Sequence, residues 1–335
     1  MQAATTQPHE APRLPSLLAD ALKPLQDYFD DEHVTEIMVN PDGVAWVERE
    51  GKTFKTDITL KEVERDVILK QTAHVDGQDC VSDTPSAVVN SIIQGMRISG
   101  GLKPFSPQGT FFSIRKHLPP HLRPSMEQLT SWGMCTQFQA QLMERLVVRD
   151  KLNGFVVGGT SSGKTTVANA LLSKIEPFER LIVIEDSQEL HVRVENTVRI
   201  KTNNQKGLTA CEAVKIALRQ KPDRLVLGET RGDETYDLIR AMNSGHDGTL
   251  STIHASSARL GLQALEMLFQ MSLPESASIS GALAKEYIAN AVQFLIFAAR
   301  RYEKLADGTY KAVRKIEQIV LVKGVKNGDY VLEEI

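Results

Sequence analysis

The hydrophobic pattern in the first third of the chain is that of short strands and short helices. Val34 to Val39 and Val44 to Val47 are apolar-rich runs on either side of the turn Asn40-Pro41-Asp42-Gly43, which is typical of a β-hairpin. Apolar residues at helical spacing predict helices in the same region. The further elements expected here are helices over Leu14–Phe29, broken near Pro24, and over Leu60–Thr72, and a strand over Phe111–Arg115, while residues 85–103 match neither period.

The remaining two thirds of the chain alternate short apolar runs with amphipathic helices. Phe138, Leu142 and Leu146, with Met143 and Val147 beside them, mark the first of these helices. Such alternation is typical of a parallel sheet covered by helices. The strands expected here are 155–157, Leu181–Ile184, Leu225–Leu227 and Leu250–Ile253, with helices that follow Lys164, Thr209 and Asp233.

Prolines separate the two patterns. Pro119, Pro120 and Pro124 lie so close together that no regular helix or strand can include them. We therefore expect a linker at this point, and we expect it to act as the hinge between the two domains. The expected parts are a disordered lead at 1–13, an N-terminal α+β domain at 14–116, the linker at 117–125 and a C-terminal α/β domain at 126–335.

The composition is that of an ordinary globular protein. A net charge of −3 over 335 residues gives no general electrostatic reason to expect nucleic acid as the main partner. This net charge does not rule out a local basic strip on the surface. The three cysteines are far apart and predict neither a zinc site nor a disulfide framework. No stretch approaches the roughly 18 consecutive apolar residues of a membrane span, and the N-terminus lacks the features of a signal peptide. We expect a cytoplasmic protein without a transmembrane segment.

One motif carries clear chemistry. Gly158, Gly163, Lys164 and Thr165 match the phosphate-binding pattern G-x-x-x-x-G-K-[ST] between an apolar run and an amphipathic helix. Lysine can reach the β- and γ-phosphates of ATP, and the threonine hydroxyl can bind Mg²⁺. The alternative is a glycine-rich turn that carries a lysine by chance. The residues expected to contact the nucleotide are Gly158, Gly159, Thr160, Ser161, Ser162, Gly163, Lys164, Thr165 and Thr166.

Polar residues follow three of the expected strands. Glu185 and Asp186 end one strand, Glu229 follows another, and His254 follows a third. In an open α/β sheet, ligands bind beyond the carboxyl ends of the strands, so these groups meet at one site if the strands are neighbours. Glu229 would then orient or activate water, and Glu185, or less favourably Asp186, would hold Mg²⁺ through its waters. His254 or His246 would sense the γ-phosphate. A helix cap or a structural histidine is the alternative for each.

Four segments, in order, resemble the four motifs of the secretion traffic ATPases. They are 158–166, 184–190, 227–232 and 245–255, which correspond to the Walker A, Asp, Walker B and His boxes. Residues 34–49 resemble the N-terminal domain of the type IV secretion and conjugative-transfer branch. The resemblance implies an α/β fold, with a RecA-like P-loop NTPase domain and a smaller α+β N-terminal domain, that hydrolyses ATP with Mg²⁺.

The resemblance also implies an assembly. Its members form homohexameric rings at the cytoplasmic face of the bacterial inner membrane, with inner-membrane components of a secretion or conjugation machine as partners. They power pilus assembly and the translocation of protein or DNA by domain motion. In keeping with the net charge of −3, no stable nucleic-acid binding is expected for this chain. The alternatives are a DNA-stimulated nucleic-acid motor, a pilus-retraction motor, and a nucleotide-gated assembly factor with negligible turnover.

The resemblance has one further implication, and the sequence departs from the family pattern at two points. It implies that N-terminal arginines reach the nucleotide, and Arg97 and Arg115 match best by position, with a solvated surface arginine as the alternative. Ser161 stands where relatives commonly carry glycine, which could tighten the loop or alter nucleotide affinity. The four-cysteine motif of many type II secretion relatives has no counterpart here, which argues against that branch.

Overall fold

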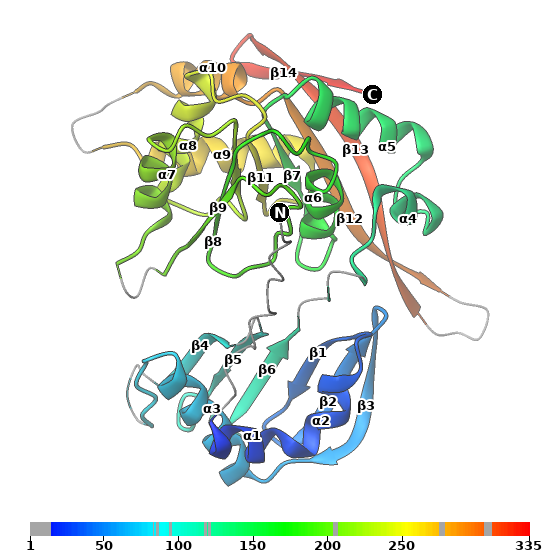
Figure 1. The fold of residues 1–335 in the computed structure, drawn as a ribbon, viewed down its shortest axis with the longest axis vertical. Coiled ribbons are helices and arrows are strands. Elements are labelled where there is room, and N and C mark those ends of the chain that lie inside the picture. The colour runs from blue at the N-terminus through cyan, green and yellow to red at the C-terminus, as the bar shows by residue number, and fades with distance from the viewer. Residues whose placement is uncertain are drawn as a thin grey trace, which may run out of the picture. The chain divides into compact units, whose positions relative to one another are not determined.

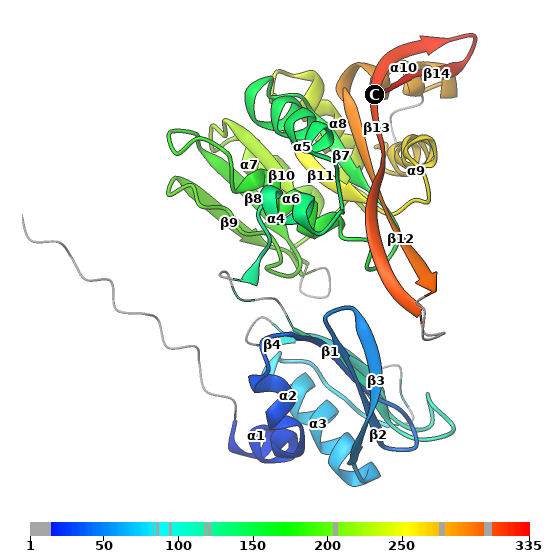
Figure 2. The same cartoon turned by 90° about the vertical axis from the view of Figure 1, so that its right-hand side faces the viewer.

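The computed structural model describes residues 15–82, 84, 87–93, 96–116, 119, 122–203, 207–274, 279–304 and 310–335. The chain divides into two compact units, Met1–Pro119 and Pro120–Ile335 (Figures 1 and 2). The expected lead at 1–13 and residues 117, 118, 120 and 121 of the expected linker lie outside the described residues. The linker and its hinge role therefore stay predictions.

The N-terminal unit is a six-stranded antiparallel sheet in the order β3-β2-β1-β6-β5-β4. In Figure 1 its helices lie on one face of the sheet. The strands are β1 Val34–Val39, β2 Val44–Arg49, β3 Lys52–Thr59, β4 Val88–Ile93, β5 Met96–Gly101 and β6 Phe111–Arg115. The helices are α1 Ser16–Leu22, the 3₁₀ turn Lys23–Leu25, α2 Gln26–Asp30 and α3 Glu62–Val75.

The sequence located most of this unit. The predicted hairpin is β1 and β2, and Gly43 at its turn has φ +87°, which glycine adopts without strain. The expected helical break falls at the 3₁₀ turn that contains Pro24. The strand β3 was not predicted, because six of its eight residues are exposed and give no alternating apolar pattern. The unassigned residues 85–103 contain β4 and β5, which pair with each other.

The C-terminal unit is an eight-stranded sheet in the order β14-β13-β12-β7-β11-β10-β8-β9. Neighbours from β12 to β9 are parallel, and β13 and β14 are antiparallel. The strands are β7 Gly154–Val157, β8 Leu181–Glu185, β9 Thr197–Lys201, β10 Arg224–Leu227, β11 Leu250–Ile253, β12 Phe294–Lys304, β13 Tyr310–Lys326 and β14 Asp329–Glu334. The helices are α4 Met126–Ser131, α5 Gln137–Glu144, the π-helical turn Arg145–Arg149, α6 Lys164–Leu172, α7 Ala210–Leu218, α8 Glu234–Asn243, α9 Ala258–Met271 and α10 Gly281–Ala291.

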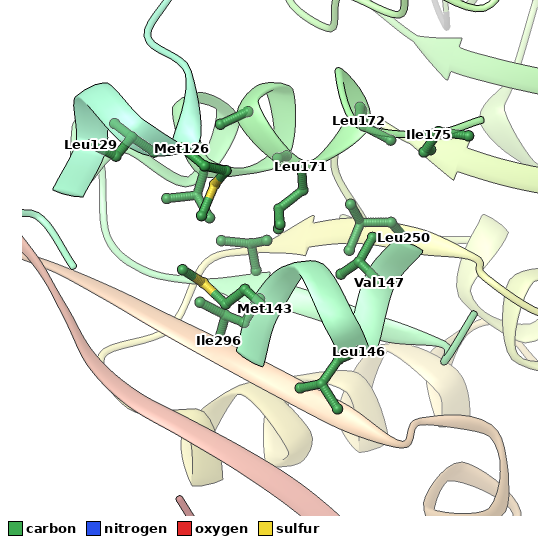
Figure 3. Packing of buried hydrophobic residues seen from close by; sticks show 14 of the residues in the cluster. Met126, Leu129, Met143, Leu146, Val147, Leu171, Leu172, Ile175, Leu250 and Ile296 are labelled. Carbon is green, nitrogen blue, oxygen red and sulfur yellow. The ribbon is translucent and has the colours of Figure 1, made fainter. Parts of the chain in front are cut away.

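This sheet carries a hydrophobic core on each face. One core packs α4, α5 and α6 against the sheet, and Figure 3 shows Met143, Leu171 and Ile296 meeting there. The other core packs α7 to α10 against the opposite face. All four residues of β7 are buried, as expected for a parallel strand covered on both sides. The strand that leads into the phosphate loop is therefore fixed from two directions.

One apolar residue that marked a predicted helix is not buried. Phe138 was expected on the apolar face of its helix, but its side chain is 60% exposed. The helix α5 instead buries Ala140 and Met143, and the π-helical turn that follows buries Leu146 and Val147. Phe138 lies in the first turn of α5, and the buried side of this helix passes through Ala140 and Met143 rather than through it.

Candidate nucleotide-binding site

The phosphate loop joins β7 to α6, and its glycines are required by space and by backbone conformation. A Cβ on Gly158 would lie 2.3 Å from the carbonyl oxygen of Ala298. Gly163 has φ +96° and caps the N-terminus of α6, where a Cβ would meet the Met134 side chain at 2.7 Å. The loop can therefore approach an anion only with glycine at both positions, and the helix that follows points its free N–H groups at the same place.

Lys164 lies inside this loop. Its side chain folds back so that Nζ donates to the carbonyls of Gly158 at 2.9 Å and Gly159 at 3.0 Å. The residue is only 8% exposed. The cation is thus held at the centre of the loop, where the phosphates of a nucleotide would bind.

The strands β7, β11, β10 and β8 are parallel neighbours, as the predicted convergence required. Their carboxyl ends bring His254, Glu229 and Glu185 to the edge of the sheet where the phosphate loop begins. Backbone contacts reinforce this edge, since the N–H of Gly158 donates to Ile253 at 3.2 Å. The fold therefore gathers the residues that the sequence had placed at three separate strand ends.

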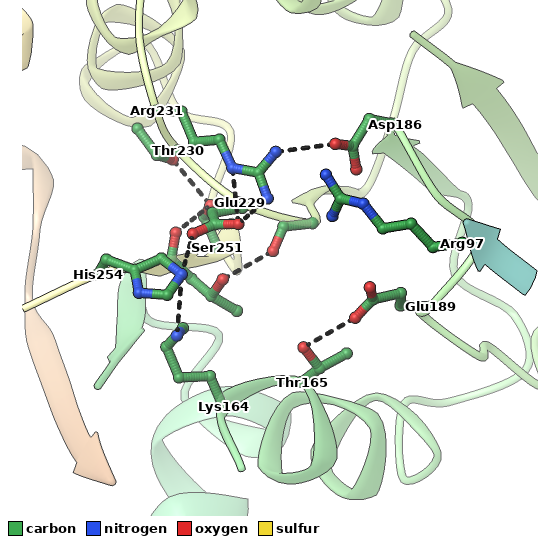
Figure 4. Close-up of polar contacts among 12 residues, drawn as sticks. Arg97, Lys164, Thr165, Asp186, Glu189, Glu229, Thr230, Arg231, Ser251 and His254 are labelled. Carbon is green, nitrogen blue, oxygen red and sulfur yellow. Dashed lines mark hydrogen bonds and ion pairs between the residues drawn. The ribbon is translucent and has the colours of Figure 1, made fainter. Parts of the chain in front are cut away.

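A chain of polar and charged groups crosses this edge (Figure 4). Nε2 of His254 lies 3.4 Å from Lys164 Nζ and 2.8 Å from Glu229 Oε1. The other carboxylate oxygen of Glu229 accepts from Arg231 Nε at 2.7 Å, and Arg231 also donates to Asp186 at 2.8 Å. If Nε2 carries the proton, it can donate to Glu229, and if Nε2 carries the lone pair, it can accept from Lys164. In either tautomer, Nε2 can hydrogen-bond only one of these two neighbours. The imidazole thus links the loop lysine to the strand-end carboxylate.

The local environment keeps this imidazole neutral. Burial lowers the pKa of His254, and the cations Lys164 and Arg231 lower it as well, while Glu229 opposes them. Arg231 was not among the expected site residues, because an arginine inside a loop gives no periodic signal. Its position two residues after Glu229 in the third motif is the feature that could have indicated it.

Glu185 is arranged differently from Glu229. It is 7% exposed, and its Oε1 accepts from the backbone N–H groups of Glu189 at 3.0 Å and Leu190 at 2.7 Å. Arg199 is its ion-pair partner at 3.7 Å. Burial raises the pKa of Glu185 to about 7, against the lowering effect of these two backbone hydrogen bonds. This carboxyl group therefore shapes the loop that follows β8.

That loop presents a carboxylate that sequence reasoning missed. Thr165 donates from Oγ1 to Glu189 Oε2 at 3.3 Å (Figure 4). Asn169 of α6 holds the same loop at two points, because Nδ2 donates to Glu189 O at 2.9 Å and Oδ1 accepts from His191 N at 2.6 Å. Glu189 was missed because it stands four residues beyond the strand end, and only the folding of the loop brings it back to Thr165.

The other expected residues are His246, Arg97 and Arg115. His246 follows α8, where its Nδ1 lies 3.3 Å from the carbonyl of Ala241, so its contacts are with the end of that helix. Arg97 and Arg115 belong to the N-terminal unit, where they are register partners on β5 and β6. Arg97 Nε lies 3.3 Å from Asn90 Oδ1 in that unit.

Comparison with known proteins identifies the family. The model of the family described as "Type II/IV secretion system protein" matches residues 88–315. The chain belongs to this family. It is 31% identical to the conjugal transfer protein TrbB of Rhizobium radiobacter over 98% of this chain and 96% of that protein. It is 29% identical to the protein VirB11 of the same species over 85% of this chain and 90% of that protein.

The fold is also similar to the X-ray structure of the ATPase DotB of Yersinia pseudotuberculosis, with a TM-score of 0.59 and 17% sequence identity. The match covers 94% of this chain and 82% of the DotB chain. This likeness concerns the fold alone. The predicted secretion ATPase superfamily and the predicted RecA-like domain with a smaller α+β N-terminal domain are thereby confirmed. Among the described residues, no helix combines the length and the apolar character needed to cross a membrane.

Proposed function

We propose that this member of the secretion ATPase family hydrolyses ATP to power type IV secretion or conjugal transfer, including pilus assembly and the translocation of protein or DNA. The likeness to TrbB over nearly the full chain supports the process. The observation that carries the activity is the line from Lys164 through His254 to Glu229 at the mouth of the phosphate loop. A γ-phosphate bound at the loop would then lie near a cation, a neutral imidazole and a carboxylate.

The proposed reaction adds water to the γ-phosphorus of ATP and breaks its bond to the bridging oxygen of ADP. The loop N–H groups and Lys164 bind the phosphates, which stabilises the charge on the transferred group. Glu229 orients the attacking water and accepts its proton. His254 contacts both Glu229 and Lys164, so it is the side chain that can sense whether the γ-phosphate is present.

The oxygen donors beside α6 fit Mg²⁺. Thr165 Oγ1 and Glu189 are hard oxygen donors at the loop, as this ion prefers, and it would complete its shell with water and phosphate oxygens. When bound, Mg²⁺ neutralises charge on the β- and γ-phosphates. The expected ligand role of Glu185 passes to Glu189 in this proposal, because the Glu185 Oε1 already accepts two backbone hydrogen bonds. Asp186 is held by Arg231 and remains the second candidate.

The family resemblance supports the rest of the proposal. The chain would work as a homohexameric ring, peripheral to the cytoplasmic face of the bacterial inner membrane, beside membrane components of the secretion or conjugation machine. Arg97 and Arg115 would supply cations to the nucleotide when the domains close about the linker at 117–125. Turnover of Arg97→Ala and Arg115→Ala, compared with their nucleotide affinity, tests this role, since an affinity effect alone would contradict it.

The first experiment is ATP turnover by the purified protein, with its mass in solution measured with and without ATP and Mg²⁺. We expect slow, Mg²⁺-dependent turnover by a hexamer that is indifferent to added DNA. Lys164→Ala is expected to lose productive nucleotide binding, because no other loop side chain carries a positive charge. Equal turnover by wild type and Lys164→Ala would contradict the proposal, and steep stimulation by DNA would favour a nucleic-acid motor.

A further inference from the structure

The carbonyl groups of the phosphate loop are held by side chains. In a loop that binds an anion, the N–H groups turn inward, so the carbonyls need donors from elsewhere. Lys164 serves Gly158 and Gly159 from within the motif. The carbonyl of Ser161 accepts from Arg314 Nε at 2.9 Å, and Arg314 stands 153 residues later in the chain. The loop is thus connected to a strand that no nucleotide-binding motif includes.

Ser161 is the residue at which the loop conformation is least favourable. Its φ is +57°, in the left-handed region that costs energy for a residue with a Cβ. Gly163 also has a positive φ, at +96°, but glycine adopts it without that cost. The hydrogen bond from Arg314 therefore ends on the one residue in this pair that needs an outside restraint.

Arg314 is well placed to provide that restraint. It lies on β13, which is paired with β12 on one side and, further along, with β14 on the other (Figure 2). Two residues later, the N–H of Ile316 donates to the carbonyl of Met134 at 2.7 Å, which anchors the strand beside the loop. Arg314 Nε has a single proton and directs it to Ser161, whereas the three protons of Lys164 Nζ must also serve the phosphates.

We propose that Arg314 is a positioning residue of the nucleotide site. It holds Ser161 in the left-handed conformation and thereby sets the affinity of the phosphate loop for nucleotide. The residue acts through the loop backbone and has no part in the reaction itself. This inference rests on the proposed function, because it concerns the loop that binds ATP.

The test compares Arg314→Gln with wild type in ADP affinity and in ATP turnover. The Kd for ADP and the KM for ATP are expected to rise about fivefold, as the loss of a hydrogen bond from a charged donor predicts, while kcat changes by less than about twofold. Arg314→Lys should recover most of the affinity, because its ammonium can donate to the same carbonyl. Arg301→Gln is the matched control, since Arg301 lies on the same ribbon and pairs with Glu317 at 2.6 Å.

A double-mutant cycle with Ser161→Gly separates this role from a general loss of stability. Glycine removes the cost of the left-handed conformation, so Arg314→Gln should change the Kd for ADP much less in the Ser161→Gly background. The inference would be overturned if Arg314→Gln raised the Kd for ADP equally in the wild-type and Ser161→Gly backgrounds. It would also be overturned if Arg314→Gln and Arg301→Gln had the same effect on this Kd. A wild-type protein that binds no ADP and hydrolyses no ATP would instead refute the proposed function.

Discussion

Glu229 and Glu185 stand at the ends of neighbouring strands, yet they sit in opposite kinds of surroundings. Leu227 of β10 is the register partner of Ile184 of β8. The backbone positions of Glu229 and Glu185 are therefore offset by only one residue along the two strands. Two side chains contact Glu229, that of His254 after β11 and that of Arg231 in the same loop, whereas backbone N–H groups of the loop after β8 bind Glu185. The comparison teaches that a carboxylate at a strand end is only a candidate catalytic group. The groups that contact it decide whether its role is catalytic or structural.

Removal of the Glu229 charge tests the chemical side of this comparison and should have the largest effect. Glu229→Gln keeps the shape of the side chain but cannot accept a proton from water. We expect kcat to fall by about 10² to 10³, with nucleotide affinity close to wild type. Single-turnover kinetics and ADP binding measure the two quantities. Glu195→Gln, at an exposed position, is the control, and a Glu229→Gln variant with near-normal turnover would remove Glu229 from the reaction.

Glu185 tests the architectural side through the pH dependence of stability. Its pKa is about 7 in the folded protein and 4.5 as the ordinary value, so the folded state binds more protons between these two pH values. The free energy of unfolding should therefore fall as pH rises from about 4.5 to about 7, by about 3 kcal/mol, and then level off.

Glu185→Gln should lack this part of the pH dependence, because its amide oxygen can still accept the two backbone hydrogen bonds but does not titrate. Chemical denaturation of both proteins at a series of pH values between 4.5 and 8 measures the difference. Parallel curves for wild type and variant would show that the carboxyl group is not perturbed in the way that its burial implies.

Glu189 sharpens the comparison, because it takes up the role that Glu185 leaves open. Glu189→Gln should raise the Mg²⁺ concentration needed for half-maximal turnover by about tenfold, as expected when a carboxylate near a bound metal is lost. The neighbouring Gln188→Ala is the control, since Gln188 is exposed. If Glu185→Gln raises the Mg²⁺ requirement and Glu189→Gln does not, the assignment of the two carboxylates is reversed.

The sequence predicted those features that rest on local pattern. The phosphate loop, its flanking strand and helix, and the polar residues at the ends of β8, β10 and β11 could all be located, because spacing and glycine positions mark them. The partners of these residues could not. Glu189 reaches Thr165 only because the loop after β8 folds back, and Arg314 reaches Ser161 only because β13 is added beside β12. Both contacts depend on tertiary structure, which periodicity does not encode.

The N-terminal unit shows the same limit. Its hairpin and α3 follow from alternation and helical spacing, whereas β3 lies at the sheet edge with a mainly exposed surface and gives no such signal. The pair β4 and β5 includes Ser99, Gly100 and Gly101, whose small side chains weaken the strand pattern. Strands that depend on neighbours more than on their own residues remain hidden in a single sequence.

Asn169 has a mechanical consequence. With one side-chain amide it imitates a backbone partner, since it donates to Glu189 O and accepts from His191 N. The helix that carries Lys164 and Thr165 is thereby latched to the loop that carries Glu189. If either the helix or the loop moves, these two hydrogen bonds couple its movement to the other. The affinity for phosphate and the affinity for the metal would therefore change together.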